Sequence, residues 1–210
     1  MTPTRILLTG ASGAVGSAVL ERLDHRSVIA MTHRRSLPGP GLRGNIIRPR
    51  FGMSRDEYRA LAAQIDVVIH CAAGVTHSPR TNYLHKVNVD GVAEVLRFVA
   101  DADARLVYTT TAFTARTGAN APFDAYADTK AAGDALVRES GAPASVAHIS
   151  TVIGDPRAGR TTRLQALEYL LGFGMSGQLP FLPLRTRYPG RLRFPRYGGR
   201  GVDRVGTQQQ

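Results

Sequence analysis

Residues 9–16 read TGASGAVG and directly follow the apolar run ILL at residues 6–8. Glycines at this spacing have separate uses: Gly10 permits a tight turn, Gly13 lets backbone N–H groups approach a pyrophosphate, and Gly16 lets a helix pack closely on the preceding strand. A turn without a ligand would explain the glycines alone. The apolar strand before them and the amphipathic stretch 14–24 after them supply the context that predicts a dinucleotide-binding Rossmann unit.

The rest of the chain alternates short β-branched runs with longer helical patterns, which predicts an α/β fold with a doubly wound parallel sheet. Strands are expected near 4–9, 28–32, 45–48, 66–71, 104–109 and 144–149. Helices are expected near 14–24, 54–64, 81–100, 125–140 and 161–173. The Pro- and Gly-rich residues 36–44 predict a loop.

The composition favours an ordinary enzyme domain. The chain has 210 residues, 43% of them hydrophobic, which is enough for one α/β domain with a substantial core. Its one cysteine, Cys71, excludes a disulfide framework, and the sequence holds no Cys/His cluster with metal-ligand spacing. It also holds no secretory signal and no apolar run of the roughly 18 residues that a membrane span needs. We therefore expect a cytoplasmic protein with no metal and no membrane partner.

The net charge of +11 is unevenly distributed. Residues 185–204 contain seven arginines and one acidic residue, Asp203, whereas the remaining chain carries 20 basic and 15 acidic residues. That smaller excess is ordinary for an enzyme that binds anionic cofactors. We therefore expect no nucleic-acid partner.

A candidate catalytic pair follows from the spacing of Tyr126 and Lys130. Four residues apart on a predicted helix, the two side chains share one face, so that the ammonium can lie beside the phenol and stabilise a phenolate. The pair follows the threonines 109–111, which end a predicted strand where ligand chemistry gathers in open α/β sheets. A hydroxyl at that point can polarise a substrate carbonyl. Strand packing and a helix cap are the structural alternative for the threonines.

The glycine turn, strand-end threonines and Tyr-x-x-x-Lys, in this order, resemble the short-chain dehydrogenase/reductase superfamily, and the glycine spacing resembles its extended and atypical branches. The match is closest to the thioester-reductase and male-sterility (fatty acyl-CoA reductase) group and covers roughly residues 4–187. The stretches that carry this closer resemblance are HCAA at 70–73, NVDG at 88–91, TTAF at 110–113 and STVIGD at 150–155.

The resemblance implies roles for individual residues. Thr111 would polarise the carbonyl, with Thr110 as the competing choice, Tyr126 would be the general acid of reduction, and Lys130 would activate it. Asn88 would order the helix behind the catalytic residues, although a packing or capping role explains an asparagine equally well. The residues expected to line the cofactor site are Gly10, Ser12, Gly13, Ala14, Val15, Gly16, His33, Arg34, Arg35, Cys71, Ala72, Ala73, Thr109, Thr110, Tyr126 and Lys130.

The cofactor preference depends on the residues after the second predicted strand. NAD enzymes place an acidic residue there to bind the ribose 2′-hydroxyl. This chain has Thr32, His33, Arg34 and Arg35 instead. A pair of guanidinium groups suits a 2′-phosphate, which favours NADP(H) over NAD(H). A solvated basic turn is the alternative.

The last residues do not follow the family pattern. We expect a Rossmann domain over 1–187 and an aberrant basic tail over 188–210, in place of the family's substrate lobe. Residues 190–200, GRLRFPRYGGR, could be encoded by codons that, read one base later, permit the family's Val-Asp-Phe-Val strand. A frameshift beginning near 187–189 would explain the arginines and the lost periodicity together. A true basic tail that binds nucleic acid or an acidic partner is the alternative.

These observations predict an NADP-dependent oxidoreductase that reduces a carbonyl or a thioester-type acyl group, small or carrier-bound, by hydride transfer. The alternatives are an NAD-dependent nucleotide-sugar epimerase or dehydratase, and a non-catalytic NADP-binding module. The resemblance also implies a possible homodimer, formed through the helices that carry Asn88 and Tyr126.

Overall fold

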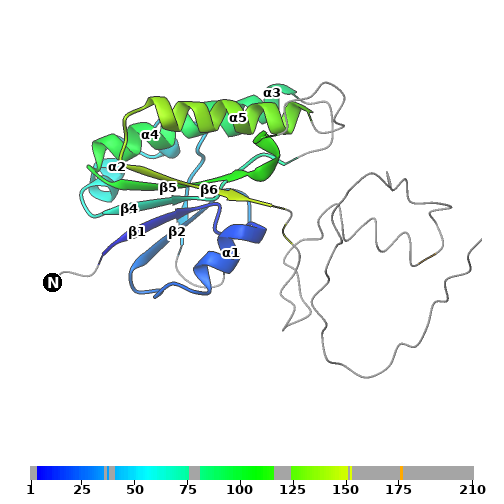
Figure 1. Ribbon diagram of the computed structural model, residues 1–210. Helices are drawn as coiled ribbons and strands as arrows, with labels where there is room; N and C mark the ends of the chain where they lie inside the picture. The colour runs from blue at the N-terminus through cyan, green and yellow to red at the C-terminus, as the bar shows by residue number, and fades with distance from the viewer. Residues whose placement is uncertain are drawn as a thin grey trace, which may run out of the picture. The chain divides into compact units, whose positions relative to one another are not determined.

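The computed structural model describes residues 4–35, 37, 41–75, 81–115, 124–150, 152 and 176. Every helix and strand reported below lies in one compact unit, Met1–Leu170 (Figure 1). The helix expected near 161–173 and the boundary expected at 187–188 lie outside the described residues, as does the tail 188–210.

Six parallel strands form one sheet in the order β3-β2-β1-β4-β5-β6. The strands are β1 (Ile6–Thr9), β2 (Val28–Thr32), β3 (Leu42–Arg43), β4 (Val67–His70), β5 (Arg105–Thr111) and β6 (Ala144–Ile149). The chain moves outward from β1 through β2 to β3 and then returns to β4 on the other side of β1. The strand order therefore reverses between β1 and β4, where ligands bind in doubly wound sheets. The predicted fold class is confirmed.

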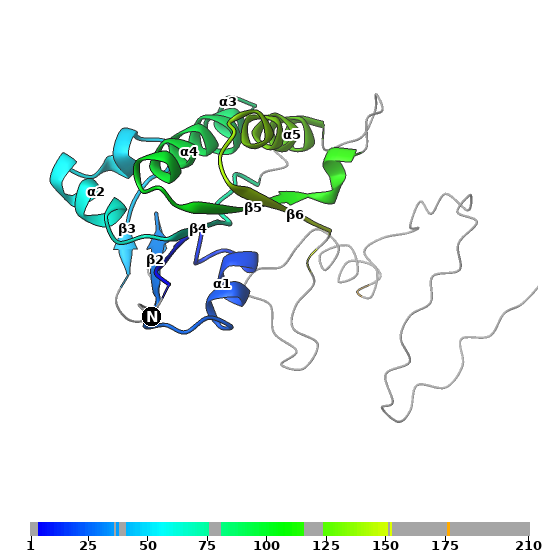
Figure 2. The ribbon, with the colours of Figure 1, turned by 60° about the vertical axis from the view of Figure 1, so that its left-hand side comes forward.

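Helices cover both faces of this sheet. The helices are α1 (Ala14–Leu20), α2 (Arg55–Ala62), α3 (Thr81–His85), α4 (Gly91–Asp101) and α5 (Asp124–Glu139). Figures 1 and 2 show α1 on one face and α2, α4 and α5 on the other. Because side chains alternate along a strand, neighbouring residues of β1 serve different faces: Leu7 joins the core under α2, α4 and α5, and Leu8 joins the core under α1.

The larger core is centred on an aromatic cluster. Phe51, Tyr58 and Phe98 lie with ring centroids 5.3 to 6.1 Å apart and are nearly or fully buried. Tyr58 comes from α2, whose first turn is closed by a reciprocal capping box between Ser54 and Glu57. This cap and the buried aromatic face fix α2 over the sheet.

The strand predicted at 45–48 is wrong, and part of the predicted loop 36–44 is a strand, β3. Asn45 uses its side chain to accept a hydrogen bond from the Ile47 N–H at 3.2 Å, and its carbonyl accepts one from the Arg48 N–H at 3.0 Å. Asparagine stabilises turns through this kind of local bond. The apolar pair Ile46 and Ile47 therefore lies in a turn, with Ile46 buried and Ile47 exposed.

The helix predicted over 81–100 is confirmed in its extent, but it is not a continuous α-helix. Between α3 and α4, residues Lys86–Asp90 form a π-helical segment, η2. Such segments often occur at functional sites. Within the described residues, no helix is long and apolar enough to cross a membrane.

Candidate functional site

The glycine turn after β1 is closed too tightly for side chains. Gly10 has a φ of +70°, and a Cβ added there would lie 2.5 Å from the backbone nitrogen of Ala72. A Cβ on Gly16 would lie 2.2 Å from the carbonyl oxygen of Gly10. The Gly13 N–H donates to that same carbonyl at 2.9 Å and begins α1. The turn, the helix and the loop after β4 therefore meet backbone to backbone, as the sequence predicts for Gly10 and Gly16.

The loop after β4 continues this backbone surface. The Cys71 N–H donates to the Thr9 carbonyl at 3.1 Å, so the loop remains parallel to the glycine turn. Cys71 and Ala72 are partly buried and Ala73 is exposed. Burial raises the pKa of the Cys71 thiol above its usual value. These residues can therefore offer backbone and small side chains to a ligand, while the thiol stays protonated at neutral pH.

Asn88, in η2, ties this loop to α5. Its side-chain oxygen accepts from the Gly74 N–H at 2.8 Å, and its amide nitrogen donates to the Gly74 carbonyl and to the Thr129 hydroxyl, each at 3.1 Å. The side chain is almost fully buried. Asn88 thus fixes the loop that faces the glycine turn relative to the helix that carries Tyr126 and Lys130.

A basic patch follows β2. His33, Arg34 and Arg35 are exposed, and Arg43 on β3 donates to the His33 carbonyl at 3.1 Å. The pKa of His33 is lowered, first by partial burial and then by the charges of Arg34, Arg43 and Arg48. Several guanidinium groups therefore surround one point at the carboxyl end of β2. Arg34 and Arg35 were predicted from the sequence to bind the cofactor, whereas Arg43 and Arg48, which come from the next strand and its turn, were not.

The three threonines at the end of β5 differ in their surroundings. Thr109 is partly buried and its hydroxyl donates to the His70 carbonyl at 2.9 Å, which links β5 to the end of β4. Thr110 and Thr111 are buried, and the Thr111 carbonyl accepts a bond from the Thr114 hydroxyl at 2.9 Å. Thr111 is the last residue of β5.

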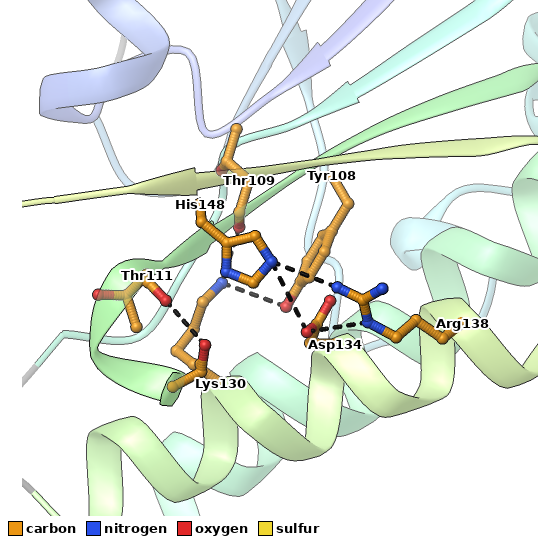
Figure 3. Close-up of polar contacts among 8 residues, drawn as sticks. Tyr108, Thr109, Thr111, Lys130, Asp134, Arg138 and His148 are labelled. Atoms are coloured by element: carbon orange, nitrogen blue, oxygen red, sulfur yellow. Dashed lines mark hydrogen bonds and ion pairs between the residues drawn. The ribbon is translucent and has the colours of Figure 1, made fainter. Parts of the chain in front are cut away.

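Lys130 is buried beneath the end of β5 (Figure 3). Its ammonium donates to the Tyr108 hydroxyl at 3.2 Å and to the Thr109 carbonyl at 2.9 Å, and it lies 4.7 Å from the centroid of the Tyr108 ring. Burial lowers the pKa of Lys130 to about 8, and the nearby Cys71 and Asp134 oppose that shift. A buried ammonium needs acceptors, and β5 supplies two of them.

Among the described residues, the Lys130 ammonium contacts the phenol of Tyr108 and not that of Tyr126. Tyr126 is partly buried one helical turn earlier on α5, and burial raises the pKa of its phenol. The expected contact between the Lys130 ammonium and the Tyr126 phenol is therefore not formed in this structure. The reason is that the lysine stem crosses to β5, where a hydroxyl and a carbonyl are both within reach.

Sequence reasoning missed two aromatic residues of this region. His70, at the end of β4, is fully buried, and its ring is stacked on that of Tyr108 with centroids 5.8 Å apart. Burial and the charge of Lys130 lower the pKa of His70 to about 3, so the imidazole is neutral. Its Nδ1 lies 2.7 Å from the Thr9 hydroxyl. A polar residue ending the apolar run 67–70 was the available signal.

α5 also carries an ion pair that faces β6. Asp134, one turn after Lys130, lies 3.2 Å from Arg138 and 4.0 Å from His148 on β6 (Figure 3). These three side chains connect the helix to the last described strand and leave Lys130 on the inner side, against Tyr108.

A protein family described as male sterility protein matches residues 41–188 of the chain. The match includes the loop after β4, the π-helical segment, β5 and α5. It confirms the family that the sequence motifs resemble.

Curated relatives include proteins much longer than this chain. A segment of 106 residues is 35% identical to the hybrid PKS-NRPS synthetase pvhA of Talaromyces variabilis, covering 46% of this chain and 3% of that protein. A segment of 154 residues is 30% identical to the glycine betaine reductase ATRR of Emericella nidulans, covering 62% of this chain and 12% of that protein. The chain therefore spans only a small part of the length of these relatives.

Among solved structures, the chain is similar to the terminal R domain of the myxalamid PKS-NRPS pathway, with a TM-score of 0.64 and 25% identity over 72% of this chain and 50% of that domain. WbmG of Bordetella bronchiseptica, solved with NAD and UDP, has a TM-score of 0.64 at 23% identity, covering 84% of this chain and 61% of that protein, which shows a shared fold alone. Taken with the glycine turn, the switch point and the family match, these likenesses lead to one conclusion: the chain belongs to the male sterility family of NAD(P)-binding domains, in the extended short-chain dehydrogenase/reductase superfamily.

Proposed function

We propose that this chain is the cofactor-binding part of an NADPH-dependent reductase that converts a carrier-bound acyl thioester to an aldehyde. The proposal is carried by the close approach of two backbone segments, at Gly10 and Ala72, between which no Cβ fits. The buried Lys130 lies within electrostatic range of Cys71 in the second of these segments. The named relatives, a terminal R domain and PKS-NRPS synthetases, support a carrier-bound substrate.

The same backbone cradle fits a pyrophosphate, because a ligand can approach N–H groups that no side chain covers. Gly10, Ser12, Gly13, Ala14, Val15 and Gly16 would hold it, with Cys71, Ala72 and Ala73 on the opposite wall. The guanidinium groups of Arg34 and Arg43 near His33 support NADP(H), because a 2′-phosphate needs positive charge at the end of the second strand. Arg35 would add to that charge.

The bound nicotinamide would supply a hydride to the thioester carbonyl carbon. Thr111, with Thr110 as the alternative, would donate a hydrogen bond to the carbonyl oxygen, and Tyr126 would give that oxygen its proton. The product of this step is a hemithioacetal, whose C–S bond then breaks to release the aldehyde and the free thiol of the carrier. Lys130 would stabilise the phenolate left on Tyr126 through its positive charge, one helical turn away on α5 and without a direct contact, and Asn88 would keep the loop 71–74 and α5 in register.

Binding and turnover test the proposal separately. Purified chain is titrated with NADPH and with NADH while the nicotinamide fluorescence is followed, and we expect the tighter binding for NADPH. Oxidation of NADPH is then measured with an acyl thioester of a pantetheine analogue, and aldehyde and free thiol are quantified in equal amounts. Equal affinity for the two cofactors would contradict the NADP assignment. Binding of NADPH without thioester-dependent oxidation would contradict the reductase assignment.

A further inference from the structure

The buried phenol of Tyr108 has no part in the reaction outlined above, yet its side chain makes two direct contacts with the Lys130 ammonium. Its hydroxyl accepts the Lys130 hydrogen bond at 3.2 Å, and its ring lies beneath the ammonium at 4.7 Å. The residue is fully buried on β5. Both contacts favour the charged ammonium over the neutral amine, one through a lone pair and the other through the negative face of the ring.

We propose that Tyr108, backed by His70, is a positioning residue that directs the Lys130 ammonium toward β5 and keeps it charged inside the protein. Only the expected effect on catalysis rests on the proposed function, because the contact between Tyr108 and Lys130 is part of the fold. Tyr108 acts through Lys130 and touches neither cofactor nor substrate in the mechanism above.

His70 fixes the ring of Tyr108 from behind. The two rings are nearly parallel, with an interplanar angle of 11°, and the imidazole is held by the Thr9 hydroxyl at 2.7 Å. Its other nitrogen, Nε2, is buried and has no hydrogen-bond partner within the described part of the chain. A second cation in this position would repel Lys130, and the neutral imidazole avoids that repulsion. His70 therefore supports the phenol ring and adds no positive charge that would repel the ammonium.

The groups that face Lys130 come from three elements. Cys71 follows β4 and His70 ends it, Tyr108 lies on β5, and Asp134 lies on α5 with Lys130 itself. Tyr126, one helical turn before Lys130, interacts with Tyr108. Burial raises the pKa of Cys71, of Tyr108 and of Tyr126, and lowers that of His70. With the pKa of Lys130 at about 8, its ammonium is the group of this cluster that loses a proton just above neutral pH.

Replacing Tyr108 by phenylalanine tests the inference, because it removes the hydroxyl and keeps the ring. The sequence contains only two lysines, Lys86 and Lys130, so a chain grown on isotope-labelled lysine gives two side-chain NMR signals. Lys86 is exposed and serves as the reference, and Lys86→Arg assigns the pair. We expect the titration midpoint of Lys130 to fall by about one pH unit in Tyr108→Phe, as the loss of a hydrogen bond to a charged group implies.

Tyr58→Phe is the matched control. Tyr58 is also a buried tyrosine whose hydroxyl bonds a charged group, Asp101 at 2.8 Å, but it lies on α2. It should destabilise the fold to a similar extent and leave the Lys130 midpoint unchanged. An unchanged midpoint in Tyr108→Phe, or an equal shift in both variants, would overturn the inference.

A measurement on the unmodified chain decides the case if Tyr108→Phe does not fold. The Lys130 methylene protons should show nuclear Overhauser contacts with the Tyr108 ring and an upfield ring-current shift, both absent for Lys86. Absence of these signals for Lys130 would overturn the inference. The titration requires no turnover, so a chain that fails to oxidise NADPH refutes the proposed function and still tests Tyr108. Where turnover is observed, its alkaline limb should move with the Lys130 midpoint.

Discussion

The two halves of the candidate site are built from different materials. At the carboxyl end of β1, the turn at Gly10 and the loop at Ala72 meet through backbone atoms, and side chains are excluded by distances as short as 2.5 Å. At the end of β5, the site is built around the buried Lys130 ammonium, which donates to the Tyr108 hydroxyl and to the Thr109 carbonyl. The first half therefore depends on close backbone packing, and the second depends on a network of charges and hydrogen bonds.

This difference predicts different responses to mutation. Where two backbone segments are in contact, any added side-chain atom pushes them apart, and we expect cofactor binding to weaken first. A polar network fails when one partner is removed, and the loss appears in chemistry, in stability or in pH dependence according to which partner is lost.

Gly10→Ala should have the largest effect, since the added Cβ would collide with the backbone of Ala72. We expect NADPH binding to weaken by more than about 100-fold and the unfolding free energy to fall by roughly 3 kcal/mol. Gly141→Ala is the control, because Gly141 has nearly the same φ, +69°, but an added Cβ there would meet nothing within 4 Å. Fluorescence titration and urea unfolding compare the two. Similar losses in both variants would mean that backbone strain, and not the close approach, explains the requirement for glycine.

Tyr126→Phe should leave NADPH affinity nearly unchanged and lower kcat by roughly 100-fold or more, the usual contribution of a general acid. The measurement is steady-state NADPH oxidation with a thioester, together with the fluorescence titration. Tyr83→Phe, at an exposed tyrosine on α3, is the control and should change neither quantity. Equal loss of binding and turnover in Tyr126→Phe would refute the proton-donor role.

Asn88→Ala should lower the unfolding free energy by about 3 kcal/mol, because it leaves the buried N–H and carbonyl of Gly74 without their partner and removes the hydrogen bond to the Thr129 hydroxyl. It should also weaken NADPH binding, since the loop 71–74 loses its link to α5. Asn82→Ala, on the exposed side of α3, is the matched control for the loss of an asparagine. If Asn88→Ala is as stable as Asn82→Ala, the bridge between the two halves contributes little.

His70 should make the chain sensitive to acid. Its folded pKa of about 3 lies below the unfolded value of 6.5, so the unfolded state binds the extra proton as pH falls below 6.5. The contribution to stability is complete above pH 6.5 and decreases toward pH 3, by up to about 1.4 kcal/mol per pH unit. Urea unfolding at a series of pH values should show a smaller slope in His70→Gln and an unchanged slope in His25→Gln, which alters an exposed histidine. Equal slopes in the chain and in His70→Gln would contradict the burial of a neutral imidazole.

Much of the fold could be predicted because its signals are local. Short apolar or β-branched runs marked β1, β2, β4, β5 and β6, and the glycine spacing marked the turn before α1. The third strand was misplaced because an apolar pair at 46–47 resembles a strand, while the side chain of Asn45 closes a turn there. That choice depends on hydrogen bonds within a few residues, but also on the burial of Ile46, which a local pattern does not reveal.

The site was predicted only in part. Gly10 and Gly16 have the close backbone surroundings that their spacing implies, because that requirement is set by backbone geometry. Asn88, whose role the family resemblance implied, links the loop after β4 to α5. Arg43 and Arg48 were not predicted, because they reach the basic patch from the next strand and its turn. His70 and Tyr108 were not predicted as site residues, although Cys71 and Thr109 beside them were, because only the packing of β4 against β5 stacks the two rings next to Lys130.

The sequence alone determined the family, the doubly wound sheet with helices on both faces, and the glycine turn, because glycine spacing and strand periodicity are properties of short segments. Only the tertiary structure decided where the Lys130 ammonium lies. The spacing of Tyr126 and Lys130 places both on one helical face, but a buried charge goes to the nearest acceptors, and these are on β5. Helical periodicity can therefore identify a lysine as a candidate, whereas packing against another strand determines its partner.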